Sequence, residues 1–326
     1  MGIIDSLSAG YRLLIQRLEL LLLPLLLDGF LWFAPRLSLE PLLQSFSAFY
    51  ADLFSQLGGA AEVTGPGLAD LPGEVTKAMD AAGKSFNLFD LLVSSSLYHV
   101  PSLLVSQPGL KTGQQSWEIV SLWNAGSGAL LLGLAGLLIG VVYMNLLARV
   151  VPLGEGEKIG AAPRLFSRLL HHWLRSIGFL LAVFLLLLMI YIPTAVVITL
   201  LMLLSPALGA GAMMLMGGLV TVILFYLYFV TVALVLDNLP VRGAIMRSIV
   251  LIRHNFWSTI GFFLLTNLIS VGMALLLRDV VGIGVIGLVL AAIVNAFVGT
   301  GLAIALLIFY RSRLIVTSDR MGAQSA

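Results

Sequence analysis

The chain has 326 residues, of which 60% are apolar and only 10% are charged, and its formal net charge is +2. A soluble domain usually carries about 25% charged residues, so this composition predicts a chain surrounded by lipid. The small net charge and the scattered basic residues argue against a nucleic-acid partner. The absence of cysteine excludes disulfides and thiolate metal sites.

Residues 1–35 predict an interfacial helix followed by a first transmembrane helix. Apolar positions recur at helical spacing from residue 3 to residue 17, with Asp5, Arg12 and Arg17 between them, as in a helix that lies on a membrane surface. Residues 18–33 then supply an apolar run of about the length that a bilayer requires. Because this run is too long for the apolar core of a signal peptide, we expect it to be retained as the first span.

Residues 36–124 contain most of the polar sequence and predict an extracytoplasmic helical insertion. Apolar residues at positions 39–57 follow helical spacing closely, which predicts a strongly amphipathic helix. A Gly/Pro-rich break follows at residues 58–73, and a second apolar helix is predicted over residues 86–97. We expect these helices to pack on the membrane or on each other, because both carry so much apolar surface.

Residues 125–310 predict a bundle of five further membrane helices, and residues 311–326 form a short tail. The spans are expected at residues 125–147, 174–204, 212–236, 256–277 and 281–309. Pro193 lies inside the second of these and predicts a kink or a strong tilt. Small residues recur every four positions along the last span and predict a face for close helix packing: Gly287, Ala291, Asn295, Gly299 and Ala303. Gly136 and Gly140 predict a similar packing face on the first of these five spans.

Two stretches of this bundle resemble each other, which indicates an internal repeat. Residues 164–181 read RLFSRLLHHWLRSIGFLL, and residues 247–264 read RSIVLIRHNFWSTIGFFL. A shift of 83 positions aligns the arginines that begin them, one histidine, and the Ile-Gly-Phe triplets. Each stretch begins as a basic amphipathic segment and continues as an apolar run, which is typical of a surface helix that enters the membrane.

The distribution of Lys and Arg predicts the orientation of the chain. If six spans place both termini in the cytoplasm, the inner segments hold thirteen basic residues and the outer segments hold five. Such an excess follows the positive-inside rule. The sequence therefore predicts an integral protein of the plasma (inner) membrane, of the kind found in bacteria, with an all-α bundle of about six spans.

Four polar side chains are predicted inside the membrane and are candidates for a functional path: Asp28, Asn145, Asn267 and Asn295. An acidic residue within a span is costly and suggests an ion or proton pathway. The structural alternative is that Asp28 lies near the outer interface, where water or one of the three asparagines satisfies it.

Motifs for catalysis are missing from the sequence. His171, His172 and His254 lack an acid at the spacing of a zinc site, so we interpret them as imidazoles at the headgroup level. The G-x-G-x-x-G match at residues 282–287 starts an apolar span, without the strand that a dinucleotide-binding fold needs. No cofactor is expected.

The basic segments that precede the repeated spans predict a surface for lipid. Residues 149–175 carry a net charge of +3 and residues 237–253 carry +2. Basic residues near an anionic leaflet contribute about 1 kcal/mol each, so we expect these segments to hold anionic lipid headgroups. The alternative is that the charges only set the topology. The candidate lipid-binding residues are Arg164, Arg168, Trp173, Arg175, Arg242, Arg247, Arg253 and Trp257.

The second basic segment carries Ala244-Ile245-x-Arg247-Ser248 and then Asn255-Phe256-Trp257. With its surface helix and aromatic-rich membrane entrance, it resembles a family of bacterial six-span proteins and the membrane domain attached to some glycerophosphoryl diester phosphodiesterases. The resemblance covers residues 140–310 and implies a similar membrane bundle. The catalytic domain of those enzymes has no counterpart here, so their activity is not implied.

Three functions remain open on the sequence alone. The first is a non-catalytic lipid-interacting or scaffold module. The second is a transporter of small solutes or lipids, which Asp28, Pro193 and the repeat favour. The third and most distant is an intramembrane enzyme.

Overall fold

The computed structural model describes residues 2–58, 71–98, 100–107, 110, 115–151 and 165–325. The described residues are almost entirely helical, apart from one pair of three-residue strands. They form two compact units. Unit 1 comprises Met1–Leu20, Val141–Ser270 and Thr300–Ala326, and unit 2 comprises Leu21–Gly140 and Val271–Gly299. Most of the predicted Gly/Pro-rich break and Arg164 lie outside the described residues.

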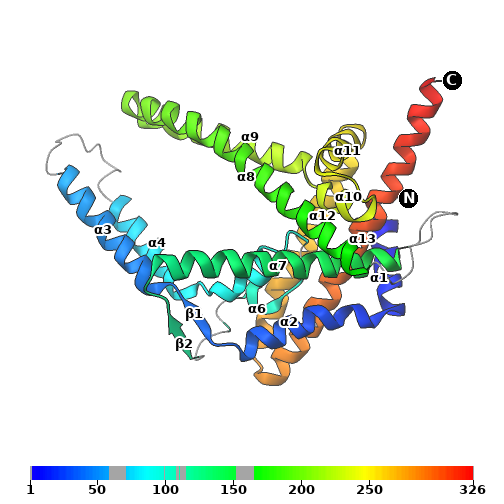
Figure 1. The fold of residues 1–326 in the computed structure, drawn as a ribbon, viewed down its shortest axis with the longest axis horizontal. Helices are drawn as coiled ribbons and strands as arrows, with labels where there is room; N and C mark the ends of the chain where they lie inside the picture. The colour runs from blue at the N-terminus through cyan, green and yellow to red at the C-terminus, as the bar shows by residue number, and fades with distance from the viewer. Residues whose placement is uncertain are drawn as a thin grey trace. The chain divides into compact units, whose positions relative to one another are not determined.

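The order of the elements along the chain can be followed in Figure 1. The helices and strands are α1 (Ile3–Gln16), a 3₁₀ turn (Leu18–Leu21), α2 (Leu22–Phe33), β1 (Arg36–Ser38), α3 (Glu40–Gly58), α4 (Leu71–Ser85), a second 3₁₀ turn (Leu88–Asp90), α5 (Leu91–Ser94), α6 (Leu103–Ser106), β2 (Ser116–Glu118), α7 (Leu122–Val150), α8 (Leu165–Leu204), α9 (Pro206–Tyr226), α10 (Val230–Leu236), α11 (Val241–His254), α12 (Phe256–Val281) and α13 (Val285–Ser325).

Five helical segments of the described chain are long and apolar enough to cross a membrane. They are Leu122–Val150, Phe166–Leu204, Pro206–Leu236, Phe256–Val281 and Val285–Thr317. These segments coincide with the second to sixth predicted spans, because long uncharged runs of this kind have few alternatives to a membrane helix. The fold is therefore all-α, with multiple helices suited to a membrane.

The first predicted span is not confirmed. Helix α1 ends at Gln16, a 3₁₀ turn follows, and α2 has 12 residues. A helix of that length covers about 18 Å, short of the roughly 30 Å of a hydrocarbon core. The break has a local cause, since Pro24 lacks an N–H group and is tolerated only in the first turn of a helix.

Helix α1 forms where an interfacial helix was predicted, and within unit 1 it packs on α13. A Cβ atom at Gly10 would lie 2.8 Å from both the carbonyl oxygen of Gly301 and the backbone nitrogen of Ala305. The side chain of Tyr11 occupies the space beside Gly301. Glycines at 10 and 301 thus allow the two backbones to approach each other closely.

Helices α8 and α9 form an apolar hairpin in unit 1 (Figure 1). Helix α8 has 40 residues, and Pro193 lies inside it without ending it. A straight helix of this length measures about 60 Å, roughly twice the thickness of the hydrocarbon core, so one end extends beyond it. The most apolar stretch of α8 contains no buried residue, which fits a surface covered by lipid.

The two similar stretches differ in one respect. The first continues without interruption through α8, whereas the second divides at Asn255 into α11 and α12. Asn255 has φ −128° and ψ 32°, and its side-chain amide donates to the Leu251 carbonyl and to Thr317 Oγ1 of α13. The internal repeat is therefore not confirmed by the fold.

The insertion in unit 2 contains the predicted amphipathic helix as α3. Helix α4, which was not predicted, lies beside it (Figure 1), and Gly83 packs against the backbone of Glu40. The helix predicted over 86–97 is shorter, because the Asn87 side chain accepts from Phe89 N and starts a new turn there. Leu97 then adopts a φ of 57°, which ends regular helix.

A parallel pair of short strands ties the two ends of the insertion together, and it was not predicted. Leu37 of β1 pairs with Trp117 of β2. Beside this pair, the Arg36 guanidinium donates to the carbonyl oxygen of Gly83 at 2.8 Å and to that of Phe86 at 3.4 Å. The paired residues are far apart in sequence and too few to produce a recognisable strand pattern.

The small residues of the last span pack closely within unit 2. Ala291 is fully buried in a cluster with Leu103 and Leu277. A Cβ atom at Gly299 would collide with the ring of Pro101. On α7, a Cβ atom at Gly136 would lie 2.6 Å from the Leu91 carbonyl oxygen.

The close contact at Gly299 generates a stability prediction. Gly299→Leu should lower the thermal stability of the protein in detergent, because overpacking a tight contact costs about 1–3 kcal/mol. Gly272→Leu on α12 is the matched control, since nothing lies within 4 Å of an added Cβ there. Equal melting temperatures for the two variants would contradict the predicted packing of α13 on this side.

Candidate functional site: a basic surface and its polar supports

The structure divides the predicted lipid-binding residues into two groups, all of them in unit 1. Four side chains are exposed: Arg168 on α8, Arg242 and Arg253 on α11, and Trp257 at the start of α12, which is 81% exposed. Three others are half-buried: Trp173, Arg175 and Arg247. Arg164 lies outside the described residues. The half-buried arginines form hydrogen bonds inside the protein, so sequence alone overestimated the number that face outward.

Arg175 binds the loop between α10 and α11. Its Nη1 donates to the Asn238 carbonyl at 2.6 Å, to Asn238 Oδ1 at 2.8 Å, and to the Leu239 carbonyl at 3.1 Å. Asn238 has a φ of 51°, a left-handed conformation that asparagine tolerates better than most residues. Arg175 and Asn238 thus join the two ends of the long apolar hairpin.

His172 lies one turn before Arg175 and joins the same network. Its Nδ1 lies 3.1 Å from Asn145 Oδ1, and its Nε2 lies 3.3 Å from Asn238 Oδ1. Asn145 in turn donates from Nδ2 to the Val141 carbonyl at 2.8 Å. His172 is 1% exposed. It is therefore a buried bridge between α7, α8 and the loop, and not an exposed imidazole.

The other two histidines are exposed. His171 is the neighbour of the buried bridge, and His254 places Nδ1 2.8 Å from the Val250 carbonyl at the end of α11. Within the described part of the chain, no three His, Asp or Glu side chains come together in a way that could hold a metal ion.

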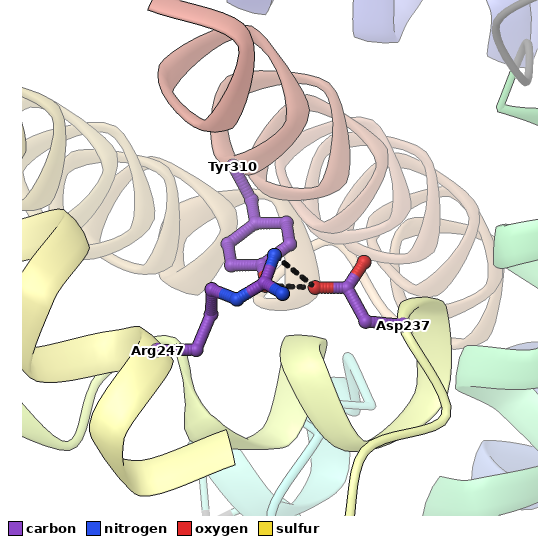
Figure 2. A network of polar contacts seen from close by, with 3 residues as sticks. All are labelled: Asp237, Arg247 and Tyr310. Atoms are coloured by element: carbon purple, nitrogen blue, oxygen red, sulfur yellow. Dashed lines mark hydrogen bonds and ion pairs between the residues drawn. The ribbon is translucent and has the colours of Figure 1, made fainter. Parts of the chain in front are cut away.

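A second polar cluster connects the same loop to α13, and Figure 2 shows its three side chains. Tyr310 donates its hydroxyl to Asp237 Oδ2 at 2.5 Å, and Arg247 Nη1 lies 3.5 Å from the same oxygen. Tyr310 is fully buried, whereas the ion pair between Arg247 and Asp237 is partly exposed to solvent. The carboxylate of Asp237 therefore joins α10, α11 and α13.

Asp237, Asn238 and Tyr310 were not predicted as site residues. The sequence contains one indication of a turn here. The apolar run is directly followed by Asp237-Asn238-Leu239-Pro240, and Asp, Asn and Pro are common in turns. Tyr310 carried no such signal, because its role depends on a contact with a residue 73 positions away.

Asp28 is buried in unit 2, with 5% of its surface exposed, and it caps a short helix. Its Oδ1 accepts from Ser102 Oγ at 2.5 Å, and its Oδ2 accepts from Leu103 N at 3.0 Å. A carboxylate at the first turn of a helix satisfies N–H groups that would otherwise lack partners. Water or an asparagine was the predicted partner of Asp28, and the structure places the start of α6 beside it.

The three asparagines have separate environments. Asn145 belongs to the His172 bridge. Asn267 is exposed on α12 and donates from Nδ2 to the Phe263 carbonyl at 2.8 Å. Asn295 is half-buried on α13. Asn145 and Asn267 lie in unit 1 and Asn295 lies in unit 2, so the predicted set does not form one cluster within either unit.

Comparison of the chain with protein-family models, curated proteins and solved structures finds no match. The resemblance to the membrane domain of glycerophosphoryl diester phosphodiesterases stays a prediction.

Asn238 offers a test of the loop that closes the hairpin. Asn238→Ala should destabilise the protein more than Asn238→Gly. Both variants lose the side-chain acceptor, but alanine in a left-handed conformation costs roughly 1–2 kcal/mol more. Thermal unfolding in detergent measures the difference, and equal stability of the two variants would argue against the left-handed turn.

Asp28 offers a test of the cap. Asp28→Ala should lower stability by about 1–3 kcal/mol, because three donors at the start of α6 lose their acceptor. Asp279→Ala, which removes an exposed carboxylate, should have little effect. If Asp28→Ala were as stable as this control, the cap would be unimportant and the hypothesis of a functional acid would gain support.

Proposed function

We propose that this chain is a non-catalytic integral membrane protein that binds anionic lipid headgroups through the exposed face of α11. The observation that carries the proposal is the division of α11 into two faces. Ala244, Ser248, Leu251 and Ile252 are buried against the rest of unit 1. The opposite face carries arginines together with large apolar side chains.

The exposed face of α11 forms a stripe at helical spacing. Arg242, Met246, Val250 and Arg253 are exposed, and Trp257 extends the stripe into the first turn of α12. An amphipathic helix that combines cations with exposed apolar and aromatic side chains is suited to the boundary between headgroups and acyl chains. A helix that only set topology would need the charges but not the apolar residues between them.

Anionic lipid is the ligand that this surface favours. Each basic residue near an anionic leaflet contributes about 1 kcal/mol. Arg242 and Arg253 are exposed, whereas Arg247 is paired with Asp237. The lipid-binding contribution is therefore assigned to Arg242 and Arg253, with Arg168 on α8 as a further exposed cation.

The side of the membrane follows from the charges and from the five long apolar helices. With α7 crossing inward, the segment before α8, the segment with α11, and the C-terminal tail all lie in the cytoplasm. This placement of α11 holds whether or not residues 18–33 cross the membrane. If residues 18–33 do cross, the N-terminus is cytoplasmic too, and we retain that six-span topology as part of the proposal.

Two aligned residues of the similar stretches 164–181 and 247–264 make the same contact, which supports a common origin of the two stretches. Ser176 and Thr259 align under the shift of 83 positions, and both are fully buried. Each donates its hydroxyl to the carbonyl four residues earlier, His172 in one case and Asn255 in the other. We therefore propose that α8 and α11–α12 derive from one surface-helix and span unit.

The transporter hypothesis has less support. Asp28 already accepts hydrogen bonds from the start of α6, and Pro193 lies in a helix whose most apolar stretch contains no buried residue. Neither residue therefore favours a transport path over a structural role.

Lipid retention tests the proposal. The double variant Arg242→Gln with Arg253→Gln should retain less phosphatidylglycerol than the parent protein when both are purified from the same membranes. Native mass spectrometry of the protein–lipid complexes measures the occupancy. Losing two favourable charge contacts, at about 1 kcal/mol each, should weaken binding by roughly tenfold or more.

The matched control removes two exposed cations elsewhere. Lys77→Gln with Arg278→Gln causes the same change in net charge at two exposed positions of unit 2. Its lipid occupancy should equal that of the parent. The same anionic-lipid occupancy in all three proteins would reject the proposal and leave the arginines of α11 as topological signals.

A further inference from the structure

Helix α3 of unit 2 has one face covered by protein and one face without a partner among the described residues. On the covered side, a Cβ atom at Gly83 of α4 would lie 3.6 Å from Leu43 Cβ, and Ser47 is buried. On the other side Phe46, Phe49 and Leu53 are exposed, and Phe49 is 64% exposed. These three positions have the spacing i, i+3, i+7, so they form one apolar stripe along the helix.

The start of α7 marks the level of a membrane interface. Helix α7 is apolar and long enough to cross a membrane and begins at Leu122. Trp117 and Trp123 are exposed beside this start, and Trp123 is 81% exposed. Exposed tryptophans at the end of a span are typical of the headgroup region.

The strand pair fixes the first turn of α3 near that level. Strand β1 ends at Ser38, immediately before α3, and Leu37 pairs with Trp117. Ser38 is held on both sides, because its carbonyl accepts from Ile119 N at 3.0 Å and its hydroxyl accepts from Glu40 N at 3.2 Å. The chain therefore enters α3 and α7 from the same short sheet.

We propose that α3 lies in the headgroup layer at the N-terminal end of α7 and inserts its Phe46/Phe49/Leu53 stripe among neutral, zwitterionic lipids. Residues 40–58 contain Glu40 and Asp52 but no Lys or Arg. An interfacial helix without cations gains nothing from an anionic leaflet, and it binds through apolar area alone. This surface is independent of the basic face of α11 and takes a different class of lipid.

The experiment uses the whole 326-residue chain, which contains no cysteine. Single variants Phe46→Cys, Phe49→Cys and Gln44→Cys are labelled with the environment-sensitive dye NBD and placed in phosphatidylcholine nanodiscs. Gln44 is exposed on a different face of α3 and serves as the matched control. Both stripe positions are already exposed, so their substitution removes little packing.

Insertion predicts that the dyes at 46 and 49 emit at shorter wavelength than the dye at 44. They should be quenched by nitroxide-labelled lipid and protected from aqueous iodide. Strong iodide quenching at all three positions would overturn the proposal, because the stripe would then face water. Protection at 46 and 49 without quenching by the labelled lipid, together with cysteine cross-linking between two copies, would overturn it in favour of a protein interface.

Discussion

The contact between Arg175 and the loop at Asn238 closes a segment that contains no charged side chain. Residues 176–236 have none, so within a membrane the backbone of this segment is satisfied mainly by its own helices. Ser248 of α11 adds hydrogen bonds to the Tyr226 carbonyl and the Phe229 N–H. Two polar clusters of unit 1 lie where the hairpin begins and ends. Arg175, His172 and Asn238 form one cluster there, and Asp237 connects the neighbouring position to Arg247 and Tyr310.

In this arrangement the arginines have two different roles. Some hold helices together, and others are exposed on the surface of α11. Arg175 and Arg247 are committed to contacts that hold α8, α10, α11 and α13 in place. Those contacts hold α11 by its inner face, and the arginines and apolar residues of its outer face are exposed. The proposed lipid surface therefore depends on polar contacts made within the protein.

Several features could be predicted from the sequence because they depend on local pattern. The five long apolar helices follow from uncharged runs, and α3 follows from helical spacing at positions 39–57. Features that depend on distant partners could not be predicted. Asp28 finds its partners at 102–104, the strand at 36–38 finds its partner at 116–118, and Tyr310 finds Asp237. The interruption at Pro24 was also missed, because a long apolar run does not show where the helix restarts.

The central claim is that the outer face of α11 contacts anionic lipid in preference to neutral lipid. A fluorescent bimane label at Val250→Cys lies on this face, between Arg242 and Arg253. In nanodiscs that contain brominated phosphatidylglycerol or brominated phosphatidylcholine at equal mole fraction, the claim predicts stronger quenching by the brominated phosphatidylglycerol. Equal quenching by the two brominated lipids would contradict it.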